Sequence, residues 1–210
     1  MIFSGKRIAL LALIFALLAP VVASAQANPR RFHYMGTSVF NMPTGFTRSA
    51  MCYINDAGHS GALVSQALMG GIMEVSFLRH FNDSEKGKNI TNFKLKVLEE
   101  DTLIPSVAWG VSDLNTQLGS KIFYFAASKS IETFGVTIHA GFYKDPVTTD
   151  KKNFFAFEKM VFPLVTVGAE RNDNIDTFGI KLSPYPGLSL EIAQRDRKEE
   201  IYNINYFRSY

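Results

Sequence analysis

Bulky apolar residues alternate with small or polar ones along most of this chain, and this alternation predicts β-strands. In the segment 106–112, Val107, Trp109 and Val111 are apolar, whereas the residues between them are small or polar. A period of two places these three side chains on one face of a strand. The same spacing recurs at 73–77, 93–97, 136–143, 178–182 and 188–193. No comparable helical pattern follows the first 25 residues.

The alternating segments predict about twelve strands, separated by polar connections. The expected strands are 47–55, 61–67, 71–80, 90–98, 105–113, 121–129, 133–143, 153–161, 164–171, 175–183, 188–195 and 201–210. Their connections alternate between short (68–70, 161–163, 184–187) and long and hydrophilic (81–88, 114–120, 144–152, 196–200). The connection 99–104 is longer than others expected on its side. Short turns at one end and longer loops at the other are typical of outer-membrane barrels.

The fold predicted is therefore all-β: an antiparallel, up-and-down transmembrane β-barrel forming a single domain over 47–210. An even number of strands leaves both termini at the periplasmic end. The last strand alternates Tyr202, Ile204 and Tyr206 and ends in an aromatic residue, as in outer-membrane barrels, with Arg208 interrupting the apolar series.

Charged residues occupy the opposite face of the predicted strands. In a membrane barrel the apolar face meets lipid and the polar face lines the lumen. Val107, Trp109 and Val111 are then expected to face lipid. The residues expected to line the lumen are Glu74, Lys94, Lys96, His139, Glu158, Glu170, Lys181 and Glu191. They could contact a passing glycan or form ion pairs that fill a narrow barrel. A soluble barrel shares this periodicity with its faces inverted, so periodicity alone does not separate the two.

The first 25 residues have the three-part pattern of a secretory signal peptide. Lys6 and Arg7 precede an unbroken apolar run at 8–18, and Ala23-Ser24-Ala25 supplies a small-residue cleavage site. The apolar run is too short for a membrane-spanning helix, which needs roughly 20 residues. We expect Sec-type export to a bacterial outer membrane, and residues 26–46 form an irregular lead and a candidate plug.

The composition is rich in aromatic residues, and the sequence lacks the signals of several functional classes. The chain contains 18 Phe, 8 Tyr and 1 Trp, which suits β-strands and membrane interfaces. Its net charge of +3 offers no nucleic-acid footprint. Cys52, the only cysteine, lies in an apolar run and is expected to be a packed side chain. No phosphate loop, HExxH motif or paired-cysteine spacing is present, so no catalytic residue, metal site or cofactor is predicted.

Several segments resemble the YjbH/GfcD family of exopolysaccharide-associated outer-membrane proteins. The run LEEDTLIPSVAWGVSD at 98–113 is similar to the family segment "LEE…LPA-A-GL-D", and FAASK at 125–129 to its "-VASK" strand. NMPT at 41–44 resembles its "NMPTA" segment, and 74–79 lies where a "LEATFRY"-like strand follows. The resemblance covers roughly 36–143, and relatives of this kind are longer, with more than one barrel.

The resemblance implies a non-enzymatic barrel that acts as a conduit or scaffold in exopolysaccharide production or export. Its expected partners are outer-membrane lipid, exopolysaccharide and other polysaccharide-export proteins, and the barrel is expected to be monomeric. Two alternatives remain open: a structural or general-diffusion outer-membrane barrel, and a soluble periplasmic lipocalin-like barrel that binds a ligand in its cup.

Overall fold

Twelve strands form a closed antiparallel barrel in the part of the chain that the structure describes. This computed structural model describes residues 49–56, 59–81, 86–117, 119, 121–144 and 151–208. The strands are β1 (Ser49–Asp56), β2 (His59–Leu68), β3 (Met73–His80), β4 (Asn89–Leu98), β5 (Ser106–Ser112), β6 (Ile122–Ile131), β7 (Val136–Lys144), β8 (Lys151–Phe162), β9 (Val165–Asn172), β10 (Ile175–Tyr185), β11 (Leu188–Arg195) and β12 (Glu199–Arg208). The predicted number of strands and the antiparallel barrel are confirmed.

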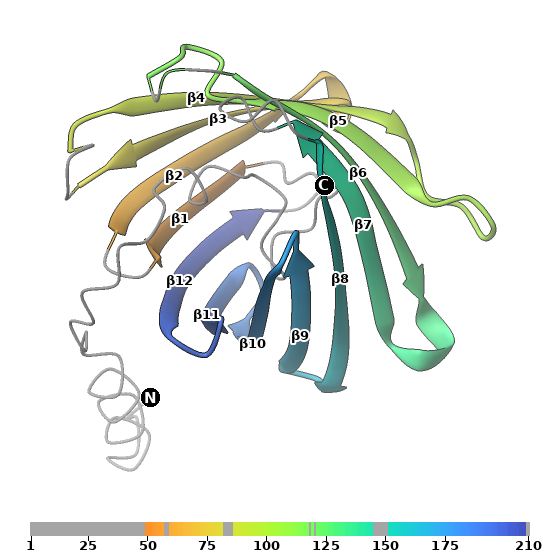
Figure 1. Ribbon diagram of the computed structural model, residues 1–210. Coiled ribbons are helices and arrows are strands. Elements are labelled where there is room, and N and C mark those ends of the chain that lie inside the picture. The colour runs from red at the N-terminus through yellow and green to blue at the C-terminus, as the bar shows by residue number, and fades with distance from the viewer. Residues whose placement is uncertain are drawn as a thin grey trace, which may run out of the picture.

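Each strand pairs with its neighbours in the chain, and β1 pairs with β12 to close the sheet. Figure 1 shows these first and last strands side by side, so the meander leaves no free edge among them. Closure satisfies the backbone hydrogen bonds that an open sheet would leave unpaired, which a barrel in lipid requires. The predicted signal peptide (1–25) and the candidate plug (26–46) lie outside the described residues.

The two ends of the barrel differ in their connections. The end that carries 81–88, 113–121 and 145–150 is called the loop end here, and the opposite end is the turn end. The turn end has the short 3-10 helices η2 (Met69–Gly71) and η3 (Glu132–Phe134), tight turns, and the longer connection 99–105. Register shifts lie at this end, in β4–β5, β8–β9 and β10–β11, where bulges commonly occur.

One predicted loop is wrong. The segment 196–200 is a tight turn, because β12 begins at Glu199 and the Lys198 amide donates to the Arg195 carbonyl at 3.0 Å. Asp196 and Arg197 adopt left-handed φ angles of 49° and 57°. Two such residues match the twist of a two-residue hairpin turn. The sequence did not predict this turn because Asp196 and Arg197 occupy positions where glycine or asparagine usually marks a tight turn.

The apolar face of the sheet is outside and the polar face is inside. Large exposed apolar side chains occur on strands all around the barrel, including Met51, Phe77, Phe125, Phe155, Phe178, Ile192 and Tyr206. A soluble lipocalin-like cup needs the opposite arrangement, because it must exclude water from an apolar interior. The structure thus separates the two barrels that periodicity left open. Among the described residues, no helix is long and apolar enough to cross a membrane.

Small apolar clusters interrupt the polar interior. Leu63, Leu78 and Ile90 form one on β2–β4, and Cys52 packs against it as a half-buried free thiol. The expectation that Cys52 is a packed side chain is confirmed.

Candidate functional site: the barrel interior

Every residue predicted to line the lumen lies at an inward position of its strand. Glu74, Lys94, His139, Glu158, Glu170 and Glu191 are buried, while Lys96 and Lys181 are partly buried. The register explains this, since residues directly opposite one another across the ladder share a face. Whether these side chains contact a solute remains a prediction.

Two pairs of opposite charge form among these residues. Lys94 Nζ lies 3.5 Å from Glu74 Oε1, and the two residues are directly opposite on β4 and β3. Lys181 Nζ on β10 lies 3.4 Å from Glu158 Oε2 on β8. This second pair spans the intervening β9, where Gly168 stands opposite Glu158. Because Gly168 has no side chain, the side chains of Glu158 and Lys181 can contact each other across the inner face of β9.

The remaining predicted residues have other surroundings. Glu191 accepts a hydrogen bond of 3.0 Å from the Asn203 amide and stands directly opposite Lys181. Lys96 lies 3.2 Å from Glu99 near the turn end, and His139 Nδ1 lies 2.8 Å from the Ser128 hydroxyl. Glu170 is buried on β9 and forms no ion pair with a described residue. The structure therefore supports neutralisation of the inward lysines, but not of every inward carboxylate.

A stronger ionic cluster at the loop end was not predicted. Arg195 Nη1 and Nη2 each donate to one Asp56 carboxylate oxygen at 2.8 Å, and Nη1 also lies 3.2 Å from Glu199. Arg195 and Asp56 lie on β11 and β1, so the pair bridges β12 beside the closure of the barrel. The alternation that placed Glu191 inward also places Arg195 inward, four residues later. That signal was present in the sequence, but Asp56 as its partner was not.

Amide and hydroxyl groups continue the polar lining. The Asn92 amide donates to the Ser76 hydroxyl at 3.2 Å, and the Ser112 hydroxyl donates to Asn92 Oδ1 at 2.8 Å. Farther round the wall, the Tyr143 hydroxyl donates to Asn172 Oδ1 at 2.9 Å. These bonds and the ion pairs above join strands that are adjacent or separated by one strand. They therefore hold the inward side chains close to the inner surface of the sheet, and this arrangement defines the shape of the interior.

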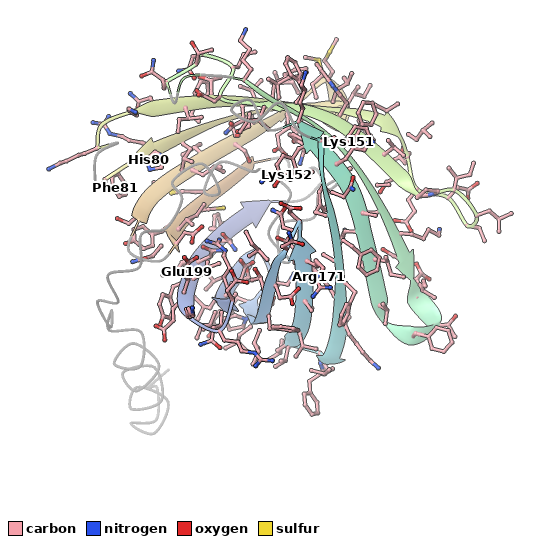
Figure 2. The ribbon with its side chains drawn as sticks, in the orientation of Figure 1. His80, Phe81, Lys151, Lys152, Arg171 and Glu199 are labelled. Atoms are coloured by element: carbon pink, nitrogen blue, oxygen red, sulfur yellow. The ribbon has the colours of Figure 1, made fainter. Side chains whose placement is uncertain are left out.

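Figure 2 labels residues at the loop-end termini of strands, among them His80 on β3, Lys152 on β8 and Glu199 on β12. Lys152 lies 3.3 Å from Asp173 in the β9–β10 turn. The rim of this end therefore carries both signs of charge.

The residues predicted to meet lipid lie on the outer face. Trp109 packs between Phe93, edge-on at a centroid distance of 6.2 Å, and Phe123, stacked at 6.3 Å. Val107 is half-buried on the same face. Val111 stands directly opposite both phenylalanines and is only 3% exposed, because large rings flank it on either side. Direct contact of these residues with lipid is a prediction.

Nothing in the described interior resembles a metal centre. No group of three or more His, Cys, Asp or Glu residues within the described ranges is placed to hold a metal ion. His139 Nδ1 contacts the Ser128 hydroxyl, but no carboxylate among the described residues orients its other ring nitrogen, as a serine hydrolase triad would require.

Comparison with known proteins gives a fold likeness only. No family model and no curated protein matches the chain. Among solved structures, it is similar to KdgM porin, with a TM-score of 0.53 and 9% identity over 77% of this chain and 98% of that one. KdgM porin in complex with disordered oligogalacturonate gives a TM-score of 0.53 and 11% identity over 77% and 99%. The chain therefore has the fold of a porin-type outer-membrane β-barrel.

Proposed function

We propose that this protein is a non-enzymatic, porin-like channel of a bacterial outer membrane, with a narrow lumen that passes small solutes with little preference for charge. The observation that carries the proposal is a closed barrel with an apolar exterior and a polar interior in which Lys94, Lys181 and Arg195 each lie beside a carboxylate. Its fold likeness to KdgM porin supports the same class. The loop end would face the outside and the turn end the periplasm.

Paired interior charges argue for weak selectivity. Oligogalacturonate is a polyanion, and a channel that binds one benefits from cations that are not neutralised by nearby carboxylates. Here Lys94 and Lys181 each lie beside a glutamate, and Arg195 lies between two carboxylates. We therefore propose no oligogalacturonate ligand for this protein.

A structural barrel without conductance is the second candidate. The observation that favours it is the burial of the inward side chains, since Glu74, Glu191 and His139 are each less than 5% exposed. A role in exopolysaccharide export rests on the resemblance of residues 36–143 to the YjbH/GfcD family. A strain that lacks the gene for this protein tests that role, because unchanged extracellular polysaccharide in that strain would contradict it.

Conductance across a planar bilayer tests the channel. We expect the full chain to insert and pass a small ion current with a reversal potential near zero in a salt gradient. Lys181→Gln leaves Glu158 without its cation and should shift the reversal potential toward cation selectivity. Lys159→Gln removes a lysine from the exposed outer face of β8 and should leave it unchanged. Insertion without current would favour the structural barrel.

A further inference from the structure

A groove of about 300 Å³ lies on the outer face of the barrel, across β5 to β8 near the loop end. Its outward-facing side chains are Trp109, Phe123, Phe125, Phe142, Lys144 and Lys151. Phe125 and Phe142 stack with a centroid distance of 5.8 Å, and Trp109 stacks on Phe123. The floor is thus a continuous aromatic surface, and two cations stand at its loop-end margin.

The two lysines are placed in a way that aromatic packing alone does not explain. Lys144 and Lys151 stand directly opposite each other on β7 and β8, and like charges at such positions destabilise a sheet. Neither forms an ion pair with a carboxylate in the described ranges. Lys151 instead holds its ammonium 3.9 Å above the centre of the Phe142 ring. An anion between the two ammonium groups would remove their repulsion.

We propose that this groove binds one lipid molecule whose headgroup carries a phosphate monoester. The phosphate would lie between Lys144 and Lys151, and an acyl chain would extend over Phe142 and Phe125 toward Trp109. The proposal rests on the proposed function, because it requires that the outer face of the barrel lies in a membrane and that the loop end lies at the membrane surface. Lysines at that level extend their ammonium groups to the headgroups while their stems stay in the apolar layer.

Charge complementarity selects the phosphate. A phosphate monoester carries a charge of about −1.5 to −2 near neutral pH and has three acceptor oxygens. Each ammonium group has three donors, so two lysines can share one such group. A zwitterionic headgroup brings its own cation and would leave the repulsion between the lysines largely in place. The aromatic floor requires an acyl chain, which inorganic phosphate lacks.

Trp109 allows a direct test, because it is the single tryptophan of the chain and it lines the groove. The full protein is reconstituted in phosphatidylcholine bilayers with a small, fixed fraction of lipid brominated on its acyl chains, which quenches tryptophan fluorescence on contact. The brominated lipid is phosphatidic acid in one sample and phosphatidylcholine in the other. We expect phosphatidic acid to be preferred roughly thirtyfold at this site, the scale expected for two lysines near an anionic headgroup.

The double variant Lys144→Gln/Lys151→Gln should lose the excess quenching, whereas the matched variant Lys159→Gln, at the turn-end side of the outer face of β8, should keep it. Added inorganic phosphate should not displace the brominated phosphatidic acid. Displacement by inorganic phosphate would show a free-anion site and overturn the lipid assignment. Equal quenching by the two lipids, or excess quenching that survives the double variant, would also overturn it. If neither lipid quenches Trp109, the membrane placement itself fails, which separates that failure from failure of the lipid site.

Discussion

The Arg195–Asp56 pair should stabilise the barrel where its first and last strands meet. Both side chains are 9% exposed, and the guanidinium binds the carboxylate through two hydrogen bonds of 2.8 Å. Arg195 also lies 3.2 Å from Glu199. The perturbations are Arg195→Met, which keeps the apolar stem, and Asp56→Asn, which keeps the shape of the acid.

The two variants should differ in cost. Removing one partner of a buried ion pair costs about 3–5 kcal/mol, because the other charge is left buried and unpaired. Arg195→Met leaves both Asp56 and Glu199 without this cation and should reach that range. Asp56→Asn leaves Arg195 with Glu199, so it should cost about 1.5–3 kcal/mol, the range for hydrogen bonds to charged groups.

Urea unfolding of the refolded full chain, followed by heat-modifiable mobility on gels, measures these free energies. The matched control is Arg171→Met. Arg171 forms the same two-bond pair with Asp176, at 2.7 Å for both bonds, but its side chain is 68% exposed. An exposed pair contributes little to stability, because solvent screens its charges. The reasoning is refuted if Arg171→Met costs as much as Arg195→Met, or if Asp56→Asn costs more than Arg195→Met.

Two further substitutions test the register and the interior packing. Trp109→Lys places a charge on the outer face and should lower the stability of the barrel by about 2–4 kcal/mol near the bilayer midplane. Ala108→Asp places a carboxylate inside, directly opposite Lys96, so more of this variant should assemble in the outer-membrane fraction. Equal assembly of the two variants would contradict the assigned faces. Gly110→Ala puts a methyl group 2.1 Å from Cζ of the Tyr124 ring and should lower the free energy of unfolding in urea by about 1–3 kcal/mol. If the ring is the cause, the double variant Gly110→Ala/Tyr124→Ala should lose less stability than the sum of the two single variants.

The sequence by itself determined the strands and their faces. A period of two assigns each residue to one side of a strand without knowledge of its neighbours. For that reason the sequence could assign Glu74, Lys94 and Glu191 to the polar faces of their strands and Trp109 to an apolar face. The same local pattern fixed the number of strands and the end that carries the longer loops at 81–88, 113–121 and 145–150.

The tertiary structure alone decided which face is inside and which charges meet. Alternation is unchanged when a barrel is turned inside out, so only the closed barrel, with its buried polar and exposed apolar side chains, shows that the polar face lies inside. Glu158 meets Lys181 across a strand, and Asp56 meets Arg195 from 139 positions away. Strand tilt and register, which depend on all twelve pairings together, set those contacts. They also place Lys144 opposite Lys151 above the aromatic groove, a juxtaposition no local pattern contains.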